Sequence, residues 1–439
     1  MTSNIVENYS KVARDYYQEG KLGPALEACK KAIELKQNLE TAYQLMGNIL
    51  RERGNKETAA DTFAKLGELF VSQGKFQRGA GAYRRATKLK PNSPIYHRDL
   101  GNALTHNHVY WYNRELKQLL IDEGCLDEAI TCYQKAIELG LNTFWINLYL
   151  GDALTARERL EEAASAYQTA LRYKIQQSYP DFVERYWDSA QINGPDFVII
   201  GAAKCGTTSL YEYMIEHPQL VQTVKKEIDF FLNFDRGLNW YLSHFPPTPK
   251  GKVNFLSGEA STSYFNHHET RTHLLEQFPN AKLIAILRNP VDRAISHYHN
   301  DRKYSGETRS LHDAMYDELK ALPDLSNGLK GGRKYWQSQR GYLWLGLYVY
   351  FIEEWMNTFP REQFLILQSE DFYAEPANTM QQVFEFLELP DYQLTEYRKY
   401  NKGSYSPTEE SLRQELSAFF KPHNQKLEKY LGRSFNWDE

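Results

Sequence analysis

A short pattern recurs over 1–180 at intervals of about 34 residues, and it constrains the fold more than any other feature. Gly20 and Gly54 share this spacing with the pair Ala25 and Ala59. The phrase EAITCYQKAIEL at 128–139 is echoed by PALEACKKAIEL at 24–35 and EAASAYQTALRY at 162–173. Such repetition predicts helical pairs that stack on their neighbours, because one pair alone cannot bury its apolar face.

A second phrase, LMGNIL around Gly47, recurs around Gly67, Gly101 and Gly151. Together the two phrases resemble tetratricopeptide repeats, in which small residues let two helices approach closely. The interval from Gly54 to Gly74, like that from Gly47 to Gly67, is shorter than the repeat, which predicts that the segment from Ala59 to Gln73 closes one repeat and opens the next. The interval from Gly101 to Gly151 is longer than the repeat and predicts an insertion. We expect an all-helical domain of about five repeats over 1–180.

Composition and charge exclude several classes of protein. Apolar residues make up 42% of the chain and charged residues 25%, which is typical of globular domains. A net charge of −4 gives no reason to expect nucleic-acid binding. There is no apolar run long enough to span a membrane, and the four cysteines form no CxxC pair, so we expect a cytoplasmic protein without disulfides or a zinc site. These cysteines are Cys29, Cys125, Cys132 and Cys205.

A second domain is predicted from residue 196 to 439, after a linker at 181–195. Residues 196–200, DFVII, are typical of a buried parallel strand, and GAAKCGTTSL follows at 201–210. A strand, a glycine-containing loop and a helix start form an anion site, because backbone N–H groups and the helix dipole converge there. A Walker A loop would carry lysine where Thr207 stands, and here Lys204 lies inside the loop instead.

The loop GxxKxGTTSL resembles the 5′-phosphosulfate loop of sulfotransferases, whose donor is 3′-phosphoadenosine 5′-phosphosulfate (PAPS). The resemblance implies that Lys204 contacts the oxygen between phosphate and sulfate, where a cation stabilises developing charge. It also implies donor binding by the rest of the loop, namely Cys205, Gly206, Thr207, Thr208 and Ser209. An ordinary glycine turn is the alternative for this motif alone.

A second motif of the same family follows a second predicted strand. KLIAILR at 282–288 runs into NPVDRAISHY, where Asn289 suits a helix cap and Pro290 the first helical position. This RNPxxRxxSxY pattern resembles the 3′-phosphate signature of sulfotransferases. The resemblance implies that Arg288 and Ser296 bind the 3′-phosphate of PAPS, a task that suits the bidentate hydrogen bonding of arginine.

The segment TVKKEIDFF at 223–231 supplies the candidate base. It resembles the KExxFF element of heparan sulfate N- and O-sulfotransferases, whose catalytic glutamate corresponds to Glu227. Sulfuryl transfer needs a base because the acceptor hydroxyl or amine must lose its proton. Asp229 stands where these enzymes often have histidine. A surface Lys–Glu pair is the alternative interpretation.

Weaker similarities extend over 195–439. GEASTSYF at 258–265 resembles a GExSPxYF element, and NKGSY at 401–405 resembles the loop that closes over the nucleotide, which implies that Lys402 and Gly403 bind the donor. The family often flanks that loop with a disulfide, but no cysteine follows Cys205. The family's fold implies an α/β domain with a P-loop-like parallel sheet and the ligand at the carboxyl ends of the strands.

The polar stretch 301–340 interrupts the predicted core, and long insertions of this kind often bind substrates. Candidate acceptor-side residues there and just before it are His299, Arg302, Arg333 and Trp336, because arginine suits anionic groups and aromatic faces suit sugars. A solvated loop without such a role is equally compatible with this composition.

Two hypotheses therefore follow from the sequence. The first is a PAPS-dependent sulfotransferase with Glu227 as base, a carbohydrate acceptor, no metal, and a protein partner on the repeats. A protein, lipid or small alcohol acceptor stays open, as does an oligomer. The second is a repeat scaffold with a degenerate nucleotide domain. A P-loop kinase fits poorly because the Walker lysine is missing.

Overall fold

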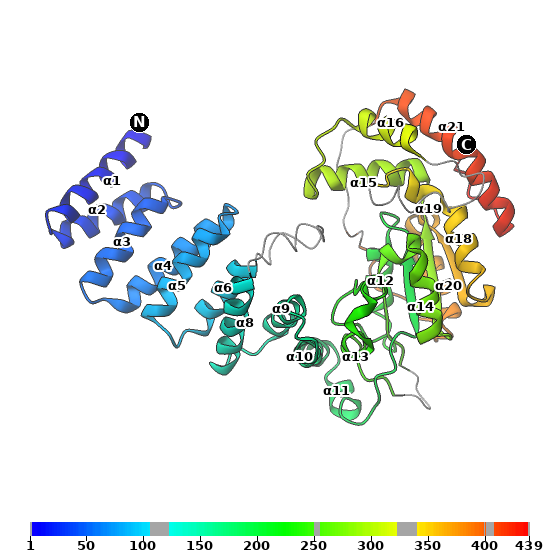
Figure 1. Cartoon of the computed structure of the whole chain (residues 1–439), viewed down its shortest axis with the longest axis horizontal. Coiled ribbons are helices and arrows are strands. Elements are labelled where there is room, and N and C mark those ends of the chain that lie inside the picture. Colours follow the sequence, from blue (N-terminus) through cyan, green and yellow to red (C-terminus); the bar gives the residue numbers. More distant parts are fainter. Residues whose placement is uncertain are drawn as a thin grey trace. The chain divides into compact units, whose positions relative to one another are not determined.

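The computed structural model describes residues 2–105, 123–249, 255–322, 340–398, 400 and 408–437. The chain divides into two compact units, Met1–Tyr173 and Lys174–Glu439. Each unit has its own architecture (Figure 1).

The first unit is built from helices, each packed against the next along the chain (Figure 1). The short connections between them contain left-handed glycines such as Gly20, Gly54 and Gly74, a backbone conformation that glycine adopts without steric cost. The described helices are α1 (Thr2–Gln18), α2 (Leu22–Leu35), α3 (Glu40–Glu52), α4 (Lys56–Ser72), α5 (Phe76–Leu89), α6 (Pro94–Thr105), α8 (Glu123–Glu138), α9 (Phe144–Ala156) and α10 (Leu160–Ser178), whose residues from Lys174 on belong to the second unit.

Four of the described helix pairs are closed by a ring that packs on a glycine. A Cβ added to Gly47 would lie 2.8 Å from the ring of Phe63, and one added to Gly151 would lie 2.6 Å from the ring of Tyr167. The ring follows the glycine at the same sequence separation in both pairs, and Gly67 and Tyr83 repeat that separation. Only a residue without a side chain lets the helices come this close.

The short interval between Gly47 and Gly67 has a simple structural cause. Helix α4 carries both Phe63, which packs on Gly47 of α3, and Gly67, which receives Tyr83 of α5. It therefore closes one repeat and opens the next, as predicted. The predicted insertion falls at 106–122, outside the described residues, and Gly101 on α6 pairs with Tyr133 on α8 across it.

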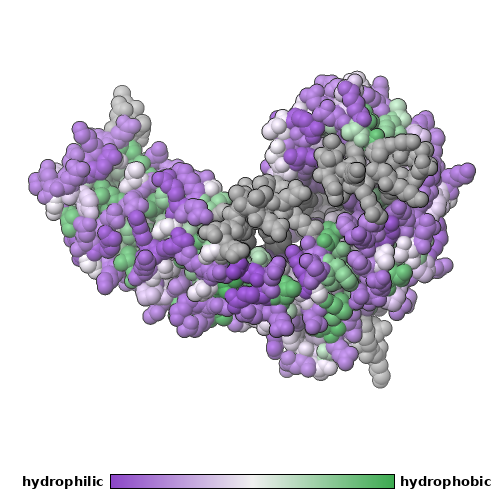
Figure 2. Space-filling view, viewed as in Figure 1, coloured by the Kyte–Doolittle hydropathy of each residue, from purple (hydrophilic) through white to green (hydrophobic). Residues whose placement is uncertain are grey.

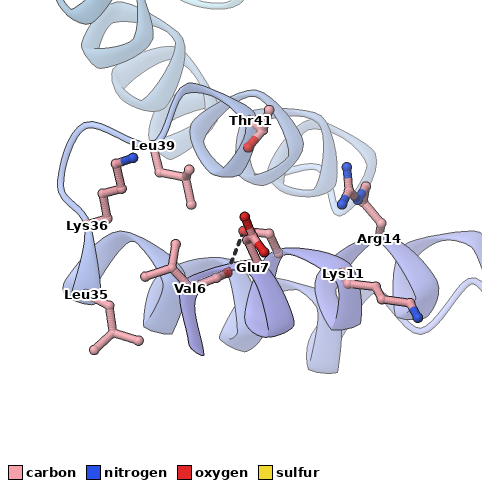
Figure 3. A pocket seen from close by; sticks show the side chains of 9 residues that line it. Val6, Glu7, Lys11, Arg14, Leu35, Lys36, Leu39 and Thr41 are labelled. Atoms are coloured by element: carbon pink, nitrogen blue, oxygen red, sulfur yellow. Dashed lines mark hydrogen bonds between the residues drawn. The ribbon is translucent and has the colours of Figure 1, made fainter. Parts of the chain in front are cut away.

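The exterior of the described chain is mainly polar. On the face shown in Figure 2, hydrophilic side chains predominate and apolar ones form small separate patches. Among the described helices, none combines the length and apolar character needed to cross a membrane. A hollow of about 710 Å³ borders α1 and the connection from α2 to α3, with Glu7 between Lys36 and Arg14 (Figure 3). Its mixed lining favours no single class of ligand.

The second unit is built on a four-stranded parallel sheet in the order β2-β1-β3-β4. The strands are β1 (Phe197–Gly201), β2 (Gly258–Glu259), β3 (Lys282–Leu287) and β4 (Phe364–Gln368). Nearly every residue of β1 and β3 is buried, which is why both segments are continuous apolar runs in the sequence. The two predicted strands are thus confirmed as neighbours, and their carboxyl ends lie together.

Helices surround this sheet (Figure 1). They are α11 (Pro180–Tyr186), α12 (Thr207–Met214), α13 (Leu238–Leu242), α14 (His268–Gln277), α15 (Pro290–Tyr304), α16 (Leu311–Ala321), α18 (Tyr348–Met356), α19 (Ser369–Ala374), α20 (Pro376–Phe386) and α21 (Glu410–Leu431). Helix α18 is preceded by residues 342–344, whose backbone N–H groups donate to the buried carboxylate of Glu318.

Candidate active site

The loop between β1 and α12 forms the floor of the site. Gly206 has φ 105° and precedes the helix, and a Cβ there would lie 2.9 Å from the hydroxyl of Tyr373. Glycine therefore permits both the left-handed turn and the close approach. The turn leaves the first N–H groups of α12 directed towards the loop, an arrangement that suits a phosphate.

The side chain of Lys204 is held by helix α15, which begins in the second sequence motif. Its Nζ donates to Asn300 Oδ1 on α15 at 2.8 Å. Burial lowers the pKa of Lys204, while the charges of Asp301 and Glu227 oppose that effect. The other amide atom, Asn300 Nδ2, is buried without a hydrogen-bond partner in the described structure. A partly buried ammonium whose hydrogen-bond partner is a neutral amide favours the arrival of an anion.

The remaining loop residues have unequal access to a ligand. Cys205 is fully buried, with its Sγ 3.6 Å from the hydroxyl of Tyr348, and burial raises the pKa of its thiol to about 11. Thr207 and Ser209 are also buried, whereas Thr208 is partly exposed. Ser209 Oγ accepts from the backbone N–H of Tyr400 at 3.2 Å. The Cys205 side chain is therefore sequestered under the loop, and Thr208 offers the accessible hydroxyl.

Glu227 lies beside this loop on a segment without regular secondary structure. Lys226 Nζ is 2.9 Å from Glu227 Oε1 and 3.2 Å from Thr208 Oγ1, and so connects the carboxylate to the loop. The side chain of Glu227 is 44% exposed and that of Lys226 is 17% exposed. Sequence reasoning assigned no role to Lys226, although its position next to Glu227 was a usable signal.

A buried carboxylate supports the segment that carries Glu227 through hydrogen bonds. Glu259, at the end of β2, is fully buried. It accepts hydrogen bonds from the hydroxyls of Tyr241 (2.6 Å), Tyr264 (3.1 Å) and Ser261 (2.5 Å), and from the backbone N–H of Ile228 (3.3 Å). Burial raises its pKa to about 7 despite these donors. The sequence motif contained Glu259, but nothing in it revealed this role.

Arg288 and Ser296 occupy the end of β3 and the helix after it. Asn289 caps α15, its Oδ1 accepting from the N–H groups of Val291 and Asp292, as predicted. Arg288 is partly exposed, and its guanidinium lies 3.9 Å from Asp292 Oδ2. Ser296 is also partly exposed, two turns along α15. Both side chains are thus accessible near the carboxyl end of β3, next to the loop after β1.

The predicted acceptor-side residues are less well supported. Arg302 donates to the backbone carbonyl of Arg309 at 3.1 Å, which commits much of its guanidinium to a local loop. His299 packs against Tyr298 with ring centroids 5.2 Å apart, and burial lowers its pKa. Four further predicted residues lie outside the described ones, namely Arg333, Trp336, Lys402 and Gly403. Within the described parts of the chain, no group of three His, Cys, Asp or Glu residues could hold a metal ion.

Comparisons with known proteins find a family match in each unit. A family model described as "Sulfotransferase domain" matches residues 194–434, and one described as "Tetratricopeptide repeat" matches 64–107 and 118–180. Human bifunctional heparan sulfate N-deacetylase/N-sulfotransferase 3 is 30% identical over 269 residues, which are 54% of this chain and 30% of that protein. Mouse heparan sulfate glucosamine 3-O-sulfotransferase 6 is 30% identical over 269 residues, which are 56% of this chain and 74% of that protein.

A solved sulfotransferase from Alicyclobacillus acidocaldarius is 27% identical, with 56% of this chain and 99% of that chain covered at a TM-score of 0.46. The chain spans less than a third of the N-deacetylase/N-sulfotransferase, so the similarity to that protein concerns one part of it. The family match covers more than half of this chain, over the residues that form the parallel sheet and the site. The chain is a member of the sulfotransferase domain family, joined to a tetratricopeptide repeat region.

Proposed function

We propose that the protein transfers a sulfuryl group from PAPS to a carbohydrate hydroxyl or amine, with Glu227 as the base. The observation that carries this proposal is the position of Lys226, whose ammonium contacts both Glu227 and Thr208 of the loop. A base must lie within reach of the acceptor atom while that atom faces the sulfur. The contact of the Lys226 ammonium with both the Glu227 carboxylate and the loop supports such a position for the base.

The residues fit the chemistry of the donor. PAPS supplies a sulfuryl group joined to a phosphate leaving group and carries a second phosphate on its ribose. Lys204 supplies a partly buried cation, and the Asn300 amide that accepts from it has an Nδ2 without a hydrogen-bond partner in the described structure. Arg288 supplies a partly exposed guanidinium at the end of the neighbouring strand. Two separate cations on adjacent strand ends suit a ligand with two separate anionic groups.

The mechanism divides the work among these residues. Glu227 accepts the proton of the acceptor hydroxyl or amine at a carboxylate oxygen as that atom attacks sulfur. Lys204 and the N–H groups at the start of α12 stabilise the negative charge that develops on the departing phosphate oxygen. Arg288 and Ser296 hold the 3′-phosphate and so select PAPS over ATP. The sulfuryl group passes directly to the acceptor, with the bond to sulfur forming on one side as the other breaks.

The acceptor class follows from the relatives. Two of them are named for heparan sulfate, and we extend that substrate class to this chain as a proposal. The tetratricopeptide region supports a protein partner, because such repeats commonly present an extended binding surface. The cytoplasmic location expected from the sequence stays a prediction, which cell fractionation tests.

The first experiment measures binding of the desulfated donor, 3′-phosphoadenosine 5′-phosphate, by calorimetry against ATP and 5′-AMP. We expect selective binding by the wild type and at least a tenfold loss in Arg288→Ala. Arg361→Ala is the matched control, because Arg361 donates to the carbonyl of Leu431 and precedes β4, at the amino ends of the strands and away from the loop. Equal binding of ATP, or equal loss in the control, contradicts the assignment of the donor.

The second experiment measures transfer of labelled sulfate from PAPS to N-desulfated heparan polysaccharide, beside a tyrosyl peptide, a lipid and a small alcohol. Transfer to the polysaccharide that is abolished in Glu227→Gln supports both the acceptor class and the base. Transfer only to another acceptor corrects the acceptor class. Binding of the nucleotide without transfer to any of them favours the scaffold hypothesis.

A further inference from the structure

The segment that carries Glu227 needs support from outside itself. Residues 223–229 form neither helix nor strand, so their backbone groups find no partners in a regular ladder. The N–H groups of Ile228 and Asp229 both donate to Ser261 Oγ, each at 3.0 Å. Ile228 N–H also donates to the carboxylate of Glu259, and Ala260 N–H donates to the carbonyl of Lys226 at 2.8 Å. The stretch 259–261 thus fixes the backbone on both sides of Glu227.

Glu259 is the centre of this support. Its two oxygens receive four hydrogen bonds, and three of the donors, Tyr241, Tyr264 and Ser261, are themselves buried. Four donors suit a carboxylate, whose two oxygens only accept. A hydrogen bond from the Ile228 N–H to an ionised carboxylate is stronger than one to a neutral carboxylic acid. Protonation of Glu259 therefore weakens its bond to the segment that carries Glu227.

We propose that Glu259 is a positioning residue for sulfuryl transfer, and that only its ionised form holds Glu227 in the working geometry. The proposal rests on the proposed role of Glu227 as base. Glu259 acts on Glu227 through the backbone of Ile228 and the hydroxyl of Ser261, both of which it bonds directly. The transfer activity should then fall towards acidic pH as Glu259 is protonated. We call this fall the acidic limb of the pH profile.

The groups around Glu259 set the pH of the acidic limb, because they set the pKa of its carboxyl group. Burial is the largest influence and raises its pKa, and Asp229 on the supported segment raises it further. The hydroxyls of Ser261, Tyr241 on α13 and Tyr264 lower it by hydrogen bonding. Tyr211 on α12 also faces the carboxylate, and burial raises the pKa of this tyrosine to about 12, so it stays neutral. The balance brings the pKa of Glu259 to about 7, within the range in which enzymes are assayed.

Tyr241→Phe gives the sharpest test in the assay with N-desulfated heparan polysaccharide. It keeps the ring, which stacks on Phe230 with centroids 4.5 Å apart, and removes the shortest tyrosine bond to Glu259. We expect activity at pH 9 within about twofold of the wild type and an acidic limb moved upward by about half a pH unit or more. Tyr179→Phe is the control, because it removes a half-buried hydroxyl that donates to the carbonyl of Ile215, outside the segment 223–229. The acidic limb of this control variant should stay at the wild-type pH.

Glu259→Gln should remove the limb and leave activity at least tenfold below the wild type at pH 8, because an amide cannot accept four bonds. An unchanged limb in Tyr241→Phe, or a wild-type profile in Glu259→Gln, overturns the proposal. Hydrogen exchange of peptide 223–232, corrected for intrinsic rates, gives a readout that needs no acceptor. Its protection should fall below pH 7 in the wild type and be low throughout in Glu259→Gln.

These readouts also separate the proposal from the role of Glu227. Full activity of Glu227→Gln together with pH-dependent exchange of 223–232 means that Glu259 anchors the segment and that the base lies elsewhere. Loss of activity in Glu227→Gln with pH-independent exchange means that Glu227 is the base and that Glu259 does not position it.

Discussion

Buried tyrosines serve different ends in the two units of the chain. In the repeats, the rings of Tyr133 and Tyr167 pack on Gly101 and Gly151. Each hydroxyl bonds two polar side chains on the helix that carries the glycine, namely Asn102 and Thr105 for Tyr133, and Asp152 and Thr155 for Tyr167. In the sulfotransferase unit, Tyr241 and Tyr264 direct their hydroxyls at one buried carboxylate. The first arrangement repeats with the sequence and stabilises helix packing. The second occurs beside the site and holds an irregular segment.

The comparison predicts that changes in the sulfotransferase unit separate activity from stability. Lys204→Ala should lower sulfate transfer by about 10²–10³-fold, since it removes a cation from the charge that develops on the leaving group. It should leave the unfolding free energy unchanged or raised, because burial of the ammonium already disfavours its charged form. Labelled-sulfate kinetics and denaturant unfolding check the two halves of this prediction.

Lys282→Met provides the control for charge loss. Lys282 begins β3, at the opposite end from the loop, and its Nζ bonds Glu388 at 2.7 Å. The Lys282→Met variant should transfer sulfate at nearly the wild-type rate and lose a small part of its unfolding free energy. If the two variants lower activity equally, Lys204 has no special place in the reaction.

Glu259 should make stability and activity change in opposite directions with pH. Its pKa is 4.5 when unfolded and about 7 when folded, so the folded state binds more protons between these values. The stability it contributes is complete below pH 4.5 and is lost as the pH rises through 7. Relative to Glu259→Gln, the wild type should lose about 3 kcal/mol of unfolding free energy over that interval. Denaturant titrations of both proteins between pH 5 and pH 8 measure this difference, and a constant difference would contradict it.

The contrast between the units also explains what could be predicted from sequence. The repeat pattern, the double role of α4 and the strands at Phe197–Gly201 and Lys282–Leu287 followed from local spacing and apolar runs. The anchoring of Glu227 did not, because Ile228 and Ser261 lie 33 residues apart and no local pattern joins them. The bond from Lys204 to Asn300 spans 96 residues and was missed for the same reason. Motifs predicted the site residues, and long-range hydrogen bonds in the structure show what holds their side chains and backbone.

In the repeats, the same kind of change should alter stability alone. An alanine at Gly151 would place its Cβ 2.6 Å from the ring of Tyr167, whose hydroxyl is bonded at 2.7 Å to Asp152. The ring cannot move away easily, so we expect a loss of about 1–3 kcal/mol. Gly81→Ala is the control, because nothing lies within 4 Å of its Cβ position in α5, and it should stabilise by up to about 1 kcal/mol. Equal effects of the two variants in denaturant unfolding would mean that the ring–glycine contact does not limit helix approach.

The smallest expected effect sharpens the comparison between repeats themselves. Tyr167→Phe removes hydroxyl bonds to Asp152 and Thr155, both partly exposed, so water can replace them and the loss should be about 0.5–1 kcal/mol. Tyr133→Phe removes the matching bonds to Asn102 and Thr105, and Thr105 is buried. Its cost should therefore be larger, about 1–2 kcal/mol, because the buried Thr105 hydroxyl keeps its bond to the Gly101 carbonyl, while the bond that it loses is not replaced by water. Urea unfolding of the two variants measures the order, and a reversed order would show that ring packing, not hydroxyl burial, sets the contribution of each tyrosine.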